Sequence, residues 1–205
     1  MQKKSVYSIV LSDRVVEQVD ALAYENGMSR SAMINHILAE QLSLTTPEQQ
    51  MRSILSAGEE LLRSGGTLQL LPTLADGMLA VKAPVRFKYN PSVRYAVELR
   101  TTAQGISGEL RAAARTQSES LTEALDRFFL LFSREDGLDA GQTHTENGRF
   151  TFRFLLPTTD TQAAAQQIAG LIQIIQRAMK CFFDAYPDQS ECIRAVRSSL
   201  GRSKL

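Results

Sequence analysis

The sequence predicts an α+β fold in two parts, and three observations support this prediction. A short alternating segment at residues 5–11 precedes two segments with helical apolar spacing. Alternating apolar runs near residues 85–99 and 150–154 indicate antiparallel strands. Longer segments at 107–134 and 160–185 carry apolar residues at helical spacing. We therefore expect a small module at residues 1–45 and an α+β domain at residues 46–205, whose antiparallel sheet is covered by helices.

The first predicted element is a strand at residues 5–11 whose side chains alternate between two faces. One face carries the apolar set Tyr7, Ile9 and Leu11, and the other carries Lys4, Val6, Ser8 and Val10. A strand without a neighbour leaves its backbone N–H and C=O groups unsatisfied. A second copy of the chain would supply the missing strand, so the pattern predicts a homodimer.

Two helices are expected to follow the strand. Ser12 and Asp13 provide start signals for the first helix, although Val15 in place of an acid rules out a full capping box. Asn26-Gly27 predicts its end, because glycine readily adopts the left-handed conformation there. Ser29 is expected to cap the second helix. The buried stripes would be Val15, Val16, Val19, Leu22 and Ala23, and then Met33, Ile34, Ile37, Leu38 and Leu42.

The strand exit SIVLSD, the turn NGMSRSAMI and the apolar spacing between them resemble the ribbon-helix-helix (Arc/MetJ-like) family of bacterial DNA-binding proteins. The resemblance covers the N-terminal region only, and a helical hairpin behind an edge strand is the alternative. It implies that a β-ribbon from two chains enters the major groove. The residues implied to read bases are Lys4, Val6, Ser8 and Val10. The two valines depart from the long polar groups that the family favours, and can touch only thymine methyl groups.

The same resemblance implies that the start of the second helix grips DNA phosphates. The implied contacts are Ser29, Arg30 and Ser31, with Lys3 at the end of the ribbon. Free N–H groups and the positive end of the helix dipole favour an anion there. Plain capping by Ser29 is a compatible alternative. Residues 1–45 carry a net charge of −1, which predicts modest non-specific affinity for DNA.

The second domain is expected to begin with a helix. Thr46, Pro47 and Gln49 supply its cap, its first residue and its capping-box partner, and Gly65-Gly66 ends it. A brief strand at 67–71 follows. Further strands are predicted at 85–89, 93–99 and 150–154, with a turn at Asn90-Pro91. The covering helices would span 107–134, 160–185 and 189–200, and Arg111, Arg115 and Glu119 would form a surface ladder on the first of them.

The uncovered face of this sheet is predicted to be basic. Its residues would be Arg86, Lys88, Arg94, Arg100, Arg149 and Arg153, with Glu98 as the only acid from those strands. Such a surface suits a nucleic acid, an acidic ligand or an acidic partner. The alternative is a solvated sheet face whose long basic side chains guard against aggregation.

Several classes of function find no support in the sequence. No phosphate loop, dinucleotide fingerprint or nucleophile elbow occurs, so we do not expect an enzyme, and no cofactor is implied. His36 and His144 are the two histidines of the chain and have no companion ligands at metal-binding spacing. Cys181 and Cys192 are expected to be reduced thiols. With no apolar run that could span a membrane, the expected location is the cytoplasm.

The expected function is therefore a sequence-specific transcriptional regulator, a repressor, that binds double-stranded DNA as a homodimer or higher even oligomer. The second domain would then bind a small ligand or a protein partner, or promote oligomerisation. One alternative is an antitoxin, or a plasmid partition or mobilisation accessory protein, whose C-terminal domain binds another protein. A further alternative is that the ribbon serves only dimerisation and the basic sheet face binds the target.

Overall fold

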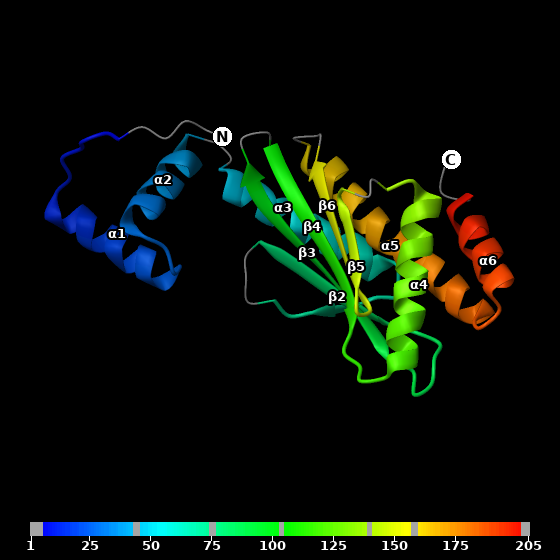
Figure 1. The fold of residues 1–205 in the computed structure, drawn as a ribbon. Helices are drawn as coiled ribbons and strands as arrows, with labels where there is room; N and C mark the ends of the chain where they lie inside the picture. Colours follow the sequence, from blue (N-terminus) through cyan, green and yellow to red (C-terminus); the bar gives the residue numbers. More distant parts are fainter. Residues whose placement is uncertain are drawn as a thin grey trace. The chain divides into compact units, whose positions relative to one another are not determined.

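The computed structural model describes residues 6–42, 46–73, 77–102, 105–138, 141–156 and 160–201. The chain is a mixed α+β protein that divides into two compact units, Met1–Gln50 and Met51–Leu205. Figure 1 shows both units, with labels on the six helices and on every strand except the first, β1 (Gln69–Leu71). Each unit is described separately below.

The first unit contains the two expected helices, α1 (Asp13–Glu25) and α2 (Arg30–Gln41). Helix α1 ends as predicted: Gly27 has a φ of +62°, and the N–H of Met28 donates to the carbonyl of Ala23 at 2.8 Å. Ser29 caps α2, because its hydroxyl accepts a hydrogen bond from the N–H of Ala32. Ser12 occupies the corresponding position before α1, but its side chain makes no capping hydrogen bond.

Helix α3 (Pro47–Ser64) begins with the predicted capping box. The N–H of Gln49 donates to the hydroxyl of Thr46 at 3.1 Å, and the N–H of Thr46 donates to the side-chain oxygen of Gln49 at 2.8 Å. This reciprocal pair satisfies two backbone N–H groups at the helix start. The boundary between the two units falls inside this helix.

The second unit is built on a six-stranded antiparallel sheet with the order β1-β2-β3-β4-β6-β5. The strands are β1 (Gln69–Leu71), β2 (Met78–Pro84), β3 (Ser92–Thr102), β4 (Gly105–Ala114), β5 (Thr143–Glu146) and β6 (Arg149–Leu156). Asn147 and Gly148, both with positive φ, form the tight turn between β5 and β6. The Gly148 N–H donates to Oδ1 of Asp126 at 2.8 Å. Asp126 lies in the helix Glu119–Asp136, so this hydrogen bond holds the hairpin against that helix.

Helices cover one face of the sheet. They are α3, α4 (Glu119–Asp136) and α5 (Thr161–Ala185), and α6 (Gln189–Gly201) packs on α4 and α5. The contact between sheet and helices includes aromatic pairs: the ring of Phe129 on α4 stacks on Phe150 of β6 with centroids 4.9 Å apart. Tyr95 of β3 is fully buried, and its hydroxyl donates to Gln176 of α5 at 2.6 Å. The prediction of an antiparallel sheet covered by helices is confirmed.

The segment 107–134 is not one helix, so that prediction was wrong. Residues 105–114 form β4, and the helix begins only at Glu119. In β4, Ile106 and Leu110 point into the core while Glu109 and Arg111 point to the uncovered face. Ala-rich sequence favours a helix locally, but pairing along both edges with β3 and β6 outweighs that preference. The predicted helical ladder of Arg111, Arg115 and Glu119 is therefore absent.

The strand predicted at 85–89 was also misplaced. Strand β2 lies at 78–84, and residues 85–91 connect it to β3. Phe87 still packs in the core, because its ring contacts Phe183 and Tyr186. His144, predicted to lie in a loop, is on β5. The helices predicted at 160–185 and 189–200 are confirmed as α5 and α6.

Candidate nucleic-acid interface

The segment before α1 is fully described from residue 6 onward, and its side chains are exposed in the single chain. Residues 6–12 form no strand within their own subunit. Val6 and Val10 are 100% exposed, whereas Tyr7, Ile9 and Leu11 become progressively less so. Tyr7, Ile9 and Leu11 are therefore less exposed than Val6 and Val10, while the strand at residues 5–11 stays a prediction. Lys3 and Lys4 lie outside the described residues, and Ser8 is exposed beside the two valines.

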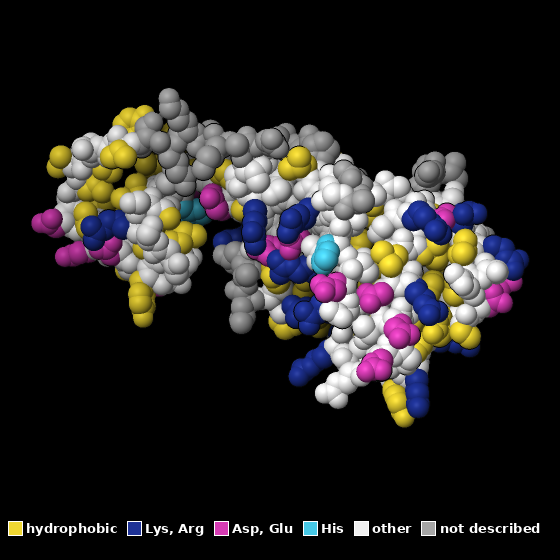
Figure 2. Space-filling view, in the orientation of Figure 1, with side chains coloured by type: hydrophobic (Ala, Val, Ile, Leu, Met, Phe, Trp, Pro, Cys, Tyr) yellow, Lys and Arg dark blue, Asp and Glu magenta, His cyan; other side chains and the backbone are white. Residues whose placement is uncertain are grey.

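The core of the first unit is small. Val19 and Ala23 of α1 pack on Met33 of α2, with Met28, Ile34 and Ile37 partly buried around them. Several apolar residues that were expected to be buried remain exposed on the same helices: Val15, Leu22, Leu38 and Leu42. Figure 2 shows hydrophobic side chains on the surface of α1 and α2.

The start of α2 brings together the residues predicted to contact phosphate. Ser29, Arg30 and Ser31 all lie at this end of the helix and are exposed. The first N–H groups of an α-helix have no intrahelical acceptor, and here the Ser29 hydroxyl accepts from one of them, that of Ala32. The remaining N–H groups of this turn are available to an anion.

Arg30 already has a carboxylate partner. Its Nε donates to Oδ1 of Asp20 at 2.6 Å, and its Nη2 donates to Oδ2 at 2.5 Å. This paired contact ties the start of α2 to α1, and it lowers the pKa of Asp20 while raising that of Arg30. Both side chains are solvent-exposed, so the pair is open to competition by another anion. Asp20 was not identified from the sequence, because its proximity depends on the angle between the two helices.

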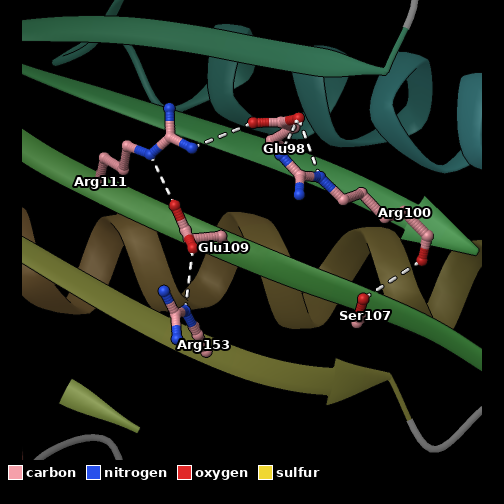
Figure 3. A network of polar contacts seen from close by, with 6 residues as sticks. All are labelled: Glu98, Arg100, Ser107, Glu109, Arg111 and Arg153. Carbon is pink, nitrogen blue, oxygen red and sulfur yellow. Dashed lines mark hydrogen bonds and ion pairs between the residues drawn. The ribbon is translucent and has the colours of Figure 1, made fainter. Parts of the chain in front are cut away.

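The uncovered face of the sheet carries a network of arginines and glutamates (Figure 3). Glu98 of β3 accepts from Arg100 at 2.8 Å and from Arg111 at 3.2 Å. Glu109 of β4 accepts from Arg111 at 2.6 Å and from Arg153 of β6 at 3.0 Å. These hydrogen bonds lower the pKa of Glu109. Two carboxylates therefore neutralise much of the charge of three arginines.

This network corrects the predicted basic surface. Arg94, Arg100, Arg149 and Arg153 do lie on strands at this face. Arg86 lies in the connection after β2 and pairs with Asp184 of α5, and Lys88 sits over the ring of Tyr89 in the same connection. Glu98 is not the only acid, because Glu109 and Glu146 share its face. Figure 2 shows acidic side chains among the basic ones over the strands.

Glu109 was not identified from the sequence, and Arg111 was assigned to a helix surface, because β4 was predicted as a helix. The signal was present in the sequence: Ile106, Leu110 and Ala112 alternate with Ser107, Glu109 and Arg111. A groove of about 440 Å³ lies at one end of this face, between Arg100, Arg153 and the residues 141–142. Both Glu98 and Glu109 line it, so it presents both signs of charge.

The described part of the chain lacks two further kinds of feature. No group of three or more His, Cys, Asp or Glu side chains there is arranged to hold a metal ion. His36 instead lies 3.3 Å from the amide of Gln49. Within the same residues, none of the helices has both the length and the apolar character needed to cross a bilayer.

Comparison with protein-family models, with curated proteins and with solved structures finds no match for this chain. The geometry of the two units therefore carries the functional inference.

Proposed function

We propose that the protein is a homodimeric DNA-binding transcriptional regulator of the ribbon-helix-helix class, with an α+β domain attached to each DNA-binding module. The observation that carries this proposal is the exposed apolar surface of the first unit. It includes Tyr7 and Ile9 before α1 and Leu22 and Leu38 on the helices. A second copy would bury these side chains and pair the residues 5–11 with their counterparts.

The size of the first core supports this step. Among the described residues, a core cluster of three buried side chains, with Ala39 of α2 also buried and three partly buried neighbours, is too small to offset the conformational entropy of ordering a module of this length. Burial of apolar surface contributes about 25 cal/mol per Å², so covering several large side chains on each chain contributes several kcal/mol. Dimerisation thus supplies the hydrophobic core that a single copy lacks, as in obligate dimers.

The proposed DNA contacts follow from the resemblance and the exposed positions. Ser8 is a hydrogen-bonding group on the outer face of the segment, flanked by the fully exposed Val6 and Val10. Two valines per chain provide methyl contacts with thymine, so we expect operators that are rich in T·A pairs. The α2 start of each chain would hold a phosphate through backbone N–H groups, Ser29 and Ser31. Arg30 would join them by leaving Asp20.

The experiment is fluorescence anisotropy with the full-length protein and fragments of its own promoter region, at several salt concentrations. Specific binding by the dimer should weaken steeply with salt, because phosphate contacts release counterions. The proposal would be ruled out if the folded dimer does not bind its promoter and also enriches no sequence from a random pool of DNA.

Two variants of one ion pair sharpen this test because they act in opposite directions. Arg30→Gln removes a phosphate contact from each chain, which should lower the salt slope by about two for a dimer. Asp20→Asn removes the competing carboxylate and frees Arg30, so affinity should rise. Arg94→Gln on the uncovered sheet face is the matched control, and its affinity should not change. A loss of binding in the Arg94 variant alone would show that the DNA-binding site lies on the sheet and not on the first unit.

A further inference from the structure

A second site lies in the α+β unit, in a groove between α4, α5 and α6 that no part of the proposed function uses. Its volume is about 260 Å³. The walls come from three helices that pack on one another, so the groove is part of the folded core region and not a gap between loops. Its lining includes Arg127, Leu130 and Arg134 of α4, Phe182 of α5, and Cys192 and Ile193 of α6.

The floor of this groove is apolar, and its one thiol has a hydrogen-bond partner. Leu131, Phe182 and Cys192 are buried, and the Cys192 thiol donates to the carbonyl of Phe182 at 3.4 Å. Burial raises the pKa of this thiol, which therefore stays neutral. Leu130 stands at the rim with 62% of its surface exposed. An aliphatic or aromatic group that binds between this leucine and the apolar floor leaves water, and burial of its apolar surface stabilises the complex.

The rim of the groove is positively charged. Arg127 and Arg134 lie on the same helix about two turns apart, on either side of Leu130 and Leu131. No acidic side chain lines the groove. Arg134 approaches Glu135 at 3.5 Å, but that carboxylate is already engaged by Arg197 at 2.8 and 3.1 Å. Arg127 forms no ion pair with any residue that the structure describes.

We infer that this groove binds a small amphipathic carboxylate. The guanidinium groups of Arg127 and Arg134 would bind the carboxylate, as arginine does in a planar, charge-assisted contact. The tail would lie over Leu130 and Ile193 toward Phe182. Ligand pockets usually range from about 300 to 1,000 Å³, so a groove of this size suits a single short chain or one aromatic ring. Binding here does not require that the protein bind DNA.

The chain contains no tryptophan, which allows a specific optical probe. Leu130→Trp places a single indole at the rim, where the exposed leucine now stands. Titration of this variant with sodium octanoate, well below its micellar range, should shift the indole emission in a saturable way. Affinity should rise about fourfold for each CH₂ added from hexanoate to octanoate, because each buried methylene contributes about 0.8 kcal/mol. 1-Octanol, which lacks the charge, should bind at least several-fold more weakly.

Charge variants test the rim directly. Adding Arg127→Gln and Arg134→Gln together to the probe variant should weaken octanoate binding by about tenfold or more. Arg94→Gln, an exposed arginine on the sheet, should leave it unchanged. Saturation-transfer NMR of octanoate with the unmodified protein provides a measurement that does not depend on the tryptophan. No transfer in that experiment, or equal affinity for octanoate in the double glutamine variant, would overturn the inference.

Discussion

The two units of this protein bury their apolar residues to very different extents. In the second unit, aromatic side chains such as Phe128, Phe129 and Phe150 are completely buried between the sheet and its helices. In the first unit, most of the large apolar side chains before and along α1 and α2 stay exposed. The second unit therefore has a complete core within one chain. The first unit buries far fewer side chains, and in the proposed dimer a second copy would cover the exposed ones.

The largest expected effect is in the complete core. Phe129→Ala removes a fully buried ring that stacks on Phe150, so it should lower the free energy of unfolding by about 3–5 kcal/mol. Urea denaturation followed by circular dichroism measures this loss. Leu130→Ala, on the next residue of the same helix but largely exposed, is the control and should cost under about 0.5 kcal/mol. Equal costs would contradict the contrast in burial.

The next prediction tests the incomplete core with two leucines of equal exposure. Leu38 on α2 and Leu155 on β6 are both 53% exposed in the single chain. Leu38→Asp should raise the dimer dissociation constant by about tenfold or more, because a charge would be buried in the dimer interface. Leu155→Asp should leave it unchanged. Sedimentation velocity over a range of concentrations distinguishes them, and identical behaviour of the two variants would exclude the proposed interface.

A smaller effect is expected on the uncovered sheet face. Arg111 and Arg153 hold the pKa of Glu109 below its ordinary value. A depressed pKa in the folded state contributes stability above the pKa of the unfolded chain, and this contribution is lost as the pH falls through the folded value. Glu109→Gln should therefore cost up to about 1 kcal/mol at neutral pH and less at pH values below about 4. Thermal unfolding from neutral to acidic pH measures the difference. A cost that stays constant with pH would show that the charge of Glu109 contributes nothing.

The smallest change in stability is expected for the ion pair of the first unit. Asp20 and Arg30 are both exposed, so Asp20→Asn should leave the unfolding midpoint nearly unchanged. The same variant should still bind DNA more tightly, as described above. A large loss of stability without a gain in DNA affinity would make this pair a structural contact between α1 and α2.

Local signals were sufficient for several helix ends and for two of the three long helical segments of the second unit, although not for 107–134. The capping residues Ser29 and Thr46, the glycine stop at Gly27 and the helices 160–185 and 189–200 were all predicted correctly. Each of these depends on contacts within a few residues along the chain, so the sequence pattern contains the necessary information. The predicted pairing of residues 5–11 with a second chain stays a prediction, since only one chain is present.

The strands and the surface charge depended on contacts that are distant in the sequence. Alanine-rich residues 111–114 favour a helix in isolation, but hydrogen bonds to β3 and β6 hold them in a strand. Because residues 105–114 form a strand, Glu109 and Arg111 lie on the uncovered face. There they form ion pairs with Arg153 and Glu98, so the face is a paired network and not the basic surface that was predicted. Sequence alone thus determined which segments are amphipathic and where most of the helices begin and end, with the start of α4 as the exception. Only the tertiary structure decided which strands are neighbours, because strand pairing joins residues that local propensity cannot relate.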